Sequence, residues 1–212
     1  MAHRNFLFDL DGTLVDSQRG IVEAAAQAVA AVLPGRPIPD LRPFIGPPIR
    51  EIFRRSLGID DPVLLARLTA RYRSAYDEEG YKFATLYDGV GAVLRTLADR
   101  RLSCCIVTNK PIVPTERMLV HLGIRAFFSD VAAPDSEQPH FDSKAQMVRA
   151  LLERAGLLRE DSVLIGDSED DAQAAFETGI SFMAVAYGYG SATQGSRYPC
   201  IAKIVHISQI LN

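Results

Sequence analysis

The chain has 212 residues, a formal net charge of −3 at pH 7, and 48% hydrophobic residues. This length suffices for one hydrophobic core, or for one core plus a small accessory domain, and the charge gives no electrostatic case for nucleic acid or an anionic membrane. Neither a signal peptide nor an apolar run long enough to span a bilayer is visible, and the three cysteines are unsuited to disulfides or zinc. We therefore expect a cytoplasmic globular protein without nucleic-acid or membrane partners.

The first predicted element is a short buried strand over residues 6–8, which stops abruptly at Asp9. Asp11 follows two residues later, so both carboxylates address one side of an extended chain, unless the turn that Gly12 permits rotates the second. Two like charges beside a buried strand need compensation, and carboxylate oxygens suit Mg²⁺. Taken alone, the pattern is equally typical of a polar strand exit that leads into a turn.

The next part of the chain is predicted to be helix and loop. Periodic apolar positions indicate helices over 21–32 and 49–57, with a proline-rich loop over 33–48 between them. A third helix begins at Pro62 with Asp61 as its N-cap and stops at Gly80. We therefore predict an all-helical insertion over residues 17–85.

Strands and helices alternate in the rest of the chain. Strands are predicted over 102–108, 127–133, 162–165 and 182–186, with helices over 88–97, 115–121, 143–155 and 170–178. This alternation is typical of an α/β fold with a Rossmann-like, doubly wound parallel sheet. We predict a core domain of residues 1–16 and 86–212, interrupted by a helical domain of residues 17–85, with hinges near 16–18 and 84–87.

Polar residues follow three predicted strands, at the edge of the sheet where such folds bind ligands. Thr108 and Asn109 stand at the end of the strand predicted over 102–108, and Lys144 opens the helix before the strand predicted over 162–165. This combination fits phosphoryl transfer, which needs a nucleophile and fixed donors for phosphate oxygens. Asp9 is the candidate nucleophile, forming an aspartyl phosphate, and Asp11 the acid and base. Thr108, Asn109 and Lys144 are the candidates to hold the phosphate, with Thr108 and Lys144 part of the catalytic set.

The same edge of the sheet offers a metal site. Asp167 follows the strand at 162–165 and would complete a Mg²⁺ site with Asp9 and the backbone carbonyl of Asp11. Asp171 lies four residues further on, as a ligand through water or as a group that orients the site.

Four ordered motifs give the chain a family resemblance. They are Asp-x-Asp-Gly-Thr-Leu-Val-Asp-Ser at 9–17, Val-Thr-Asn-Lys-Pro at 107–111, the helix-borne Lys144, and Gly-Asp-Ser-x-x-Asp at 166–171. The set resembles the haloacid dehalogenase superfamily. The insertion resembles the small helical cap of its phosphoglycolate phosphatase-like branch, as do segments 45–48, 108–111 and 187–191. The resemblance implies Asp9 as nucleophile, Asp11 as acid and base, Asp167 as Mg²⁺ ligand, and Thr108 and Lys144 as phosphate contacts.

The sequence departs at one point from the pattern of phosphoglycolate phosphatase relatives, and this departure bears on the substrate. Many phosphoglycolate phosphatase relatives carry Pro after the lysine of the third motif, whereas Lys144 is followed by Ala145, Gln146 and Met147. That continuation is similar to relatives labelled as nucleotidases or general phosphatases. Phosphoglycolate, a nucleoside monophosphate and a sugar phosphate therefore stay open. So does a mutase that moves phosphate between sugar positions, as β-phosphoglucomutase does.

The loop and short helix of the insertion are expected to set specificity. Gly46 lies in the loop, and Arg50 is either a solvated surface residue or a contact for a substrate carboxylate or phosphate. Lys110 either contacts the active site or is a loop residue without a role in it. The expected partner is a small phosphorylated metabolite, and the expected assembly is a monomer or a homodimer.

Overall fold

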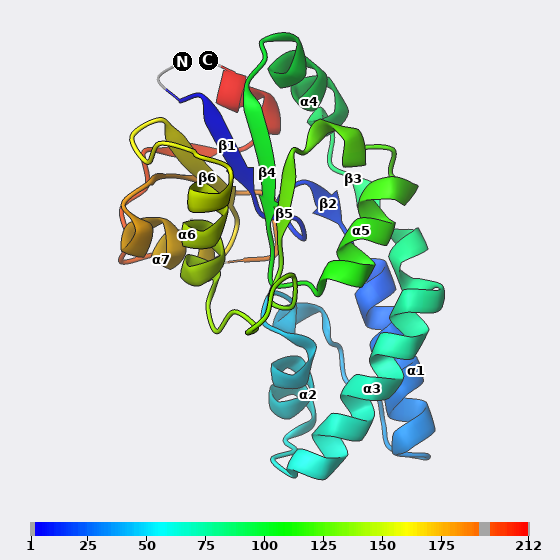
Figure 1. Cartoon of the computed structure of the whole chain (residues 1–212). Coiled ribbons are helices and arrows are strands. Elements are labelled where there is room, and N and C mark those ends of the chain that lie inside the picture. The colour runs from blue at the N-terminus through cyan, green and yellow to red at the C-terminus, as the bar shows by residue number, and fades with distance from the viewer. Residues whose placement is uncertain (1–2, 191–195, 212) are drawn as a thin grey trace. The chain divides into compact units, whose positions relative to one another are not determined.

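The structure is a computed structural model that describes residues 3–190 and 196–211. It divides into two compact units, which Figure 1 shows coloured along the chain. The core unit comprises Met1–Asp16 and Leu86–Asn212, and the inserted unit comprises Ser17–Thr85. Where the chain passes between them, β2 (Val15–Asp16) and β3 (Thr85–Leu86) pair in a small two-stranded sheet.

The core unit is built on one six-stranded sheet in which every pairing is parallel. Its strands, in spatial order, are β5 (Asp130–Ala132), β4 (Ser103–Val107), β1 (Asn5–Phe8), β6 (Ser162–Gly166), β7 (Ser181–Val185) and β8 (Ala202–Ile204). The central strand β1 pairs Phe8 with Ile106 on one side and with Ile165 on the other. The residues after these three strands therefore emerge at one edge of the sheet.

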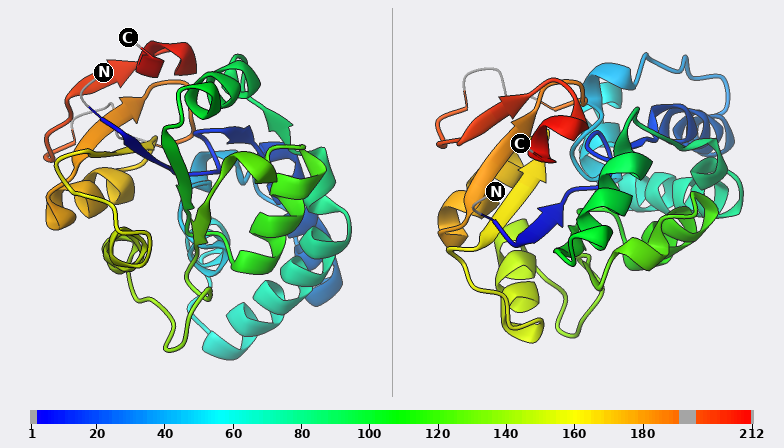
Figure 2. Two further views of the ribbon diagram at one scale, coloured as in Figure 1. Left: turned by 45° about the horizontal axis from the view of Figure 1, so that its top comes forward. Right: turned by 90° about the horizontal axis from the view of Figure 1, so that it is seen from above.

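Helices cover both faces of this sheet, as Figure 2 shows. They are α4 (Val90–Asp99), α5 (Ile112–His121), α6 (Lys144–Arg154) and α7 (Glu169–Thr178), with 3₁₀ turns at Arg125–Phe127 and Ile207–Leu211. Leu7 packs into the cluster formed with α6 and α7. Phe8, next along β1, instead meets Phe128 edge-on at 6.4 Å between ring centroids. This alternation confirms the predicted doubly wound α/β fold.

The inserted unit is entirely helix, 3₁₀ turn and loop apart from its last residue. It contains α1 (Gln18–Val32), α2 (Ile49–Leu57) and α3 (Pro62–Glu78), with 3₁₀ turns at Arg42–Phe44 and Gly80–Phe83. The side chain of Asp61 accepts hydrogen bonds from the N–H groups of Val63 (2.8 Å) and Leu64 (3.2 Å), which confirms the predicted N-cap. A Cβ on Gly20 would clash with the carbonyl of Gly80, so the start of α1 lies against the turn after α3.

Several predicted boundaries were wrong. Helix α4 begins at Val90 rather than at 88, because Gly89 occupies the N-cap position with a positive φ of 81° and Asp88 lies beside His206. Helix α5 begins at Ile112, three residues earlier than predicted, because the N–H of Ile112 donates to Asp135, 23 residues away (2.7 Å). Strand β5 is shorter than predicted, since a 3₁₀ turn ends at Phe127 and the strand begins only at Asp130, and β8 was missed.

In the described part of the chain, no helix has both the length and the hydropathy that crossing a bilayer requires. Cys104, Cys105 and Cys200 are free thiols, and the first two are buried in β4. Burial raises the pKa of Cys104 to about 12, with Cys105 adding to the shift. The prediction that these two residues serve packing is consistent with this position.

Candidate active site

Three strand ends bring polar residues to one edge of the core sheet. The N–H of Asp9 still donates to the carbonyl of Ile165 (2.9 Å), and that of Thr108 to the carbonyl of Ala132 (3.0 Å). Both residues are therefore held by the neighbouring strand rather than by a loose loop. Asp167 follows β6 directly, so its side chain starts from the same edge.

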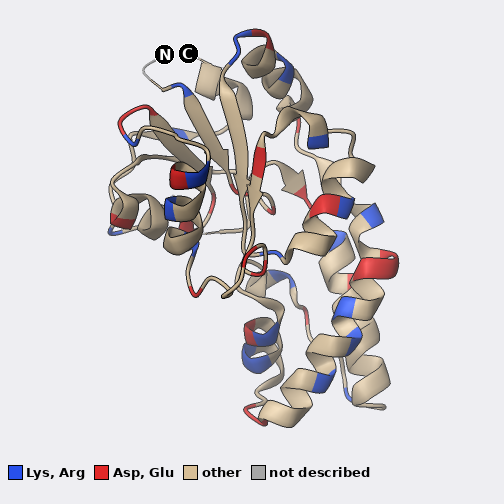
Figure 3. Cartoon of the chain, viewed as in Figure 1, with Lys and Arg blue, Asp and Glu red and all other residues tan. Residues whose placement is uncertain are grey.

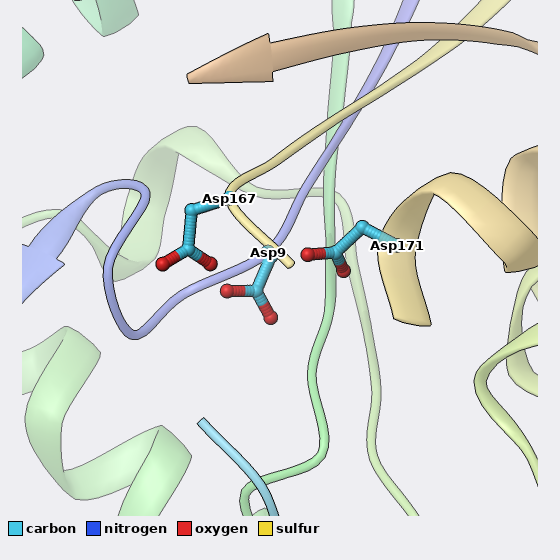
Figure 4. A group of neighbouring side chains, drawn as sticks. All are labelled: Asp9, Asp167 and Asp171. Carbon is cyan, nitrogen blue, oxygen red and sulfur yellow. The ribbon is translucent and has the colours of Figure 1, made fainter. Parts of the chain in front are cut away.

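Asp9, Asp167 and Asp171 form a buried acidic group, drawn in Figure 4. Each offers one carboxylate oxygen, and these three oxygens lie within 4.8 Å of one another. Asp9 and Asp167 come from strand ends, whereas Asp171 comes from the first turn of α7. Three buried carboxylates at this spacing repel one another unless a cation compensates, and hard oxygen ligands suit Mg²⁺. The donor set therefore fits a divalent cation.

Lys144, the first residue of α6, supplies a fixed cation to this acidic group. Its side chain is 2% exposed, and its Nζ lies 2.8 Å from Asp9 Oδ1 and 2.5 Å from Asp171 Oδ1. Burial lowers the pKa of Lys144, but Asp171 and Asp9 raise it by more, so the pKa stays above its usual value. Lys144 is therefore an ammonium ion that binds two of the three carboxylates.

Burial dominates the ionisation of the acidic group. It raises the pKa of Asp9 well above the usual value, an effect that Lys144 opposes and that Asp171 and Asp167 reinforce. Burial, followed by the charge of Asp171, likewise raises the pKa of Asp167 to about 6. A bound divalent cation would favour the ionised form of both carboxyl groups.

Asp171 is held by its own helix start as well as by Lys144. Its Oδ2 accepts hydrogen bonds from the N–H (3.0 Å) and the hydroxyl (2.6 Å) of Ser168, while its Oδ1 meets Lys144. Ser168 in turn caps α7 by accepting the N–H of Asp171 at 3.3 Å. Both carboxylate oxygens of Asp171 therefore have protein partners.

A family model described as haloacid dehalogenase-like hydrolase matches residues 6–185. The chain belongs to this family. The match confirms the resemblance carried by the four motifs, and proteins named phosphoglycolate phosphatase are among the similar proteins. Phosphoglycolate phosphatase of Vibrio cholerae is 34% identical over 190 residues, which cover 86% of this chain and 84% of that protein.

Relatives with other names have sequence identities to this chain close to that value. The 5'-nucleotidase of Pseudomonas aeruginosa is 31% identical over 196 residues, covering 90% of this chain and 86% of that protein. Tyrosine-protein kinase PtkA of Mycobacterium tuberculosis is 32% identical over 189 residues, which are 88% of this chain but 63% of PtkA. The chain therefore spans less than two thirds of that relative. The solved structure of hydrolase SP0104 from Streptococcus pneumoniae matches with a TM-score of 0.88 and 28% identity, covering 99% of this chain and 97% of that one.

The second motif, at 107–111, contacts the first, at 9–17. Thr108 is buried, and its Oγ1 accepts the N–H of Lys110 (3.1 Å), while Asn109 donates from Nδ2 to Asp170 (2.7 Å). The Nζ of Lys110 lies 3.0 Å from Oδ2 of Asp11. Asp11 is thus directed to Lys110 rather than to the acidic group, whose members among the described residues are Asp9, Asp167 and Asp171.

The segment that begins at Tyr187, one of those with a family resemblance, supports Asp167 directly. The N–H groups of Tyr189 and Gly190 both donate to Asp167 Oδ2, each at 2.8 Å. A Cβ on Gly188 would clash with the carbonyl of Gly12 and with the side chain of Asp167. In the sequence, this segment was marked by its family resemblance, which assigned it no role toward Asp167, and the last residue of the predicted segment, Ser191, lies outside the described residues.

The predicted site residues divide between the two units. The core unit brings Asp9, Asp11, Thr108, Asn109, Lys144, Asp167 and Asp171 to one edge of its sheet. Gly46 and Arg50 belong to the inserted unit, where Gly46 has a positive φ of 131° and Arg50 is exposed on the first turn of α2. Their predicted contact with substrate stays a prediction.

Proposed function

We propose that this hydrolase is a Mg²⁺-dependent phosphatase, which cleaves a small phosphorylated metabolite through an aspartyl phosphate on Asp9. The observation that carries the proposal is the buried acidic group of Asp9, Asp167 and Asp171, held against Lys144 at the carboxyl edge of the sheet. Covalent carboxylate catalysis needs a fixed, ionised nucleophile, and Lys144 stabilises the ionised form of Asp9. The phosphatase names among the relatives of this family support the same reaction.

Asp9 and Asp167 would hold the metal, with the carbonyl of Asp11 as the third protein ligand. The contacts of Asp171 with Lys144 and Ser168 favour an orienting role for it over direct coordination. When bound, Mg²⁺ would offset the negative charge of the phosphate and so ease the approach of the Asp9 carboxylate.

The residues of the chain divide the reaction into two displacements. A carboxylate oxygen of Asp9 bonds to phosphorus, the bond to the leaving oxygen breaks, and that oxygen keeps the electron pair and takes a proton from Asp11. A water molecule then loses a proton to Asp11 as its oxygen bonds to phosphorus, and the bond to Asp9 breaks. Thr108, Asn109 and Lys144 would bind the phosphate oxygens throughout.

The inserted unit is proposed as the cap that sets specificity. Arg54 on α2 already pairs with Glu51 and Asp60, whereas Arg50 is exposed on the turn that follows the Gly46 loop. An arginine there suits a substrate that carries a carboxylate beside its phosphate, as phosphoglycolate does. The relative named 5'-nucleotidase supports a nucleoside monophosphate as the second candidate.

The free thiols support a reducing compartment such as the cytoplasm. Oligomeric state, as monomer or homodimer, stays a prediction.

The deciding experiment is a phosphate-release screen across small phosphorylated metabolites, in Mg²⁺ and in chelator. We expect turnover that requires the metal, with phosphoglycolate or a nucleoside monophosphate among the best substrates. Asp9→Asn should abolish turnover while the circular dichroism spectrum stays native, since an amide is a poor nucleophile. Substantial turnover by Asp9→Asn would contradict the nucleophile, and no release from any compound would contradict the phosphatase.

A further inference from the structure

We propose that Lys110 is a positioning residue, which holds the carboxylate of Asp11 in place for proton transfer to the leaving group. The inference rests on the proposed function and adds to it a residue outside the acidic group. Sequence reasoning left Lys110 undecided between a contact with the site and a decoration of its loop.

The contact between Lys110 and Asp11 is enclosed. The Nζ of Lys110 lies 3.0 Å from Asp11 Oδ2, and the two side chains are 7% and 22% exposed. Lysine is among the residues least often buried, because its ammonium group loses hydration unless a carboxylate compensates. A lysine this enclosed therefore has a defined electrostatic partner, and that partner is the carboxylate proposed to move the proton.

The backbone of Lys110 is anchored on both sides, so its side chain starts from a fixed point. Its N–H donates to the Thr108 hydroxyl (3.1 Å), and its carbonyl accepts the hydroxyl of the buried Thr115 (3.4 Å). The helix that follows is fixed as well, because the N–H of Ile112 donates to Asp135. An anchored lysine can hold a carboxylate in one orientation, which a solvated lysine does poorly.

The charges of the site divide into two groups. Lys144 pairs with Asp9 and Asp171, whereas Lys110 pairs with Asp11. Together with Asp167, four carboxylates against two ammonium groups leave a formal charge of −2, which one divalent cation balances. Removing Lys110 would take this ammonium partner from Asp11 in a net negative site, and the carboxylate would lose the contact that orients it.

This role predicts a dependence on the leaving group. An alkoxide is a poor leaving group and needs the proton of Asp11 as the bond breaks, whereas p-nitrophenolate leaves with little help. Misplacing Asp11 should therefore slow an alkyl phosphate far more than p-nitrophenyl phosphate. A general loss of structure, or of phosphate binding, would slow both to a similar extent.

The test measures kcat and KM in Mg²⁺ for phosphoglycolate and p-nitrophenyl phosphate, with glycerol phosphate as a second alkyl phosphate. For Lys110→Met we expect kcat/KM, which reports the steps up to the aspartyl phosphate, to fall about 100-fold on the better alkyl phosphate, the size of a general-acid contribution, and less than about 5-fold on p-nitrophenyl phosphate. The value of kcat should fall on both substrates, because hydrolysis of the aspartyl phosphate also uses Asp11. Lys110→Arg should recover part of the loss, because it keeps the charge.

Two further variants separate positioning from other roles. Lys82→Met removes an exposed ion pair with Glu79 in the inserted unit and should leave both substrates unchanged. In an Asp11→Asn background, Lys110→Met should have little further effect, because the group it positions is absent. Thermal melting of each variant identifies one that does not fold, in which case Lys110→Arg alone should show the same, milder dependence on the leaving group.

Equal losses of kcat/KM on the alkyl and aryl phosphates would overturn the inference, as would a raised KM with unchanged kcat, which would make Lys110 a substrate contact. An unchanged Lys110→Met would also overturn it, while the phosphatase proposal would stand. Failure of the unaltered protein to release phosphate from any of the three probes would instead overturn the phosphatase proposal, and the inference with it.

Discussion

The charged residues of the core unit and the inserted unit differ in burial and in the sequence distance of their partners. In the core unit, Lys144 is 2% exposed and bonds to Asp9 from 135 residues away. In the inserted unit, Arg54 is 48% exposed and bonds to Glu51, three residues earlier on α2, where basic and acidic bands lie together in Figure 3. Exposed local pairs contribute little to stability, whereas breaking a buried pair leaves an uncompensated charge. Burial and long-range pairing, rather than the number of charges, therefore mark the candidate site.

Among the substitutions that test this contrast, Lys144→Met should lower the free energy of unfolding most. The change leaves Asp9 and Asp171 without their cation, and we expect a loss of about 3–5 kcal/mol in the free energy of unfolding without divalent metal. Mg²⁺ should restore part of the loss, because the cation offsets the same carboxylates. Urea unfolding with and without Mg²⁺ measures both effects. A loss no larger than that of Arg54→Ala would contradict the buried-pair argument.

Gly188→Ala should have an intermediate effect. Its Cβ would clash with the Gly12 carbonyl and with Asp167, so the segment that donates to Asp167 must shift. We expect a cost of about 1–3 kcal/mol. Mg²⁺ binding, measured by calorimetry, should weaken about 10-fold or more because a group that orients a ligand is displaced.

The matched control for that variant is Gly91→Ala, where the nearest atom to a new Cβ is the side chain of Arg95 at 3.5 Å. Since Gly91 lies in helix α4, alanine there should raise stability by up to about 1 kcal/mol and leave Mg²⁺ binding unchanged. Equal behaviour of the two alanine variants would argue against the packing described for Gly188.

Arg54→Ala should have the smallest effect. The guanidinium is exposed and pairs with Glu51 and Asp60, which water solvates equally well when the partner is removed. We expect no measurable change in the urea midpoint or in turnover. A clear loss of turnover with unchanged stability would instead assign Arg54 to substrate recognition. It would contradict the conclusion that burial and long-range pairing mark the site residues.

Local patterns predicted much of the fold. The range of α2 was predicted to the residue, and β1, β6 and α7 to within a residue or two, because apolar periodicity and caps such as Asp61 act over a few neighbouring positions. The start of α5 was misplaced because its cap comes from Asp135, and β8 was missed because a three-residue edge strand depends on its partner β7. Both errors are long-range effects that no local pattern records.

By itself, the sequence determined the fold class, the order of the motifs and the family, since these depend on strand ends and on residue types at short spacing. Only the tertiary structure decided which charged residues pair with one another and which backbone groups bind Asp167. In the structure, Asp11 pairs with Lys110, and both Asp9 and Asp171 pair with Lys144. Asp167 accepts hydrogen bonds from two backbone N–H groups. The physical reason is that the strength of an ion pair depends on distance and burial, which the folded chain sets. Backbone N–H donors are present at nearly every residue, so the identity of neighbouring amino acids does not show which of them will bind a given carboxylate.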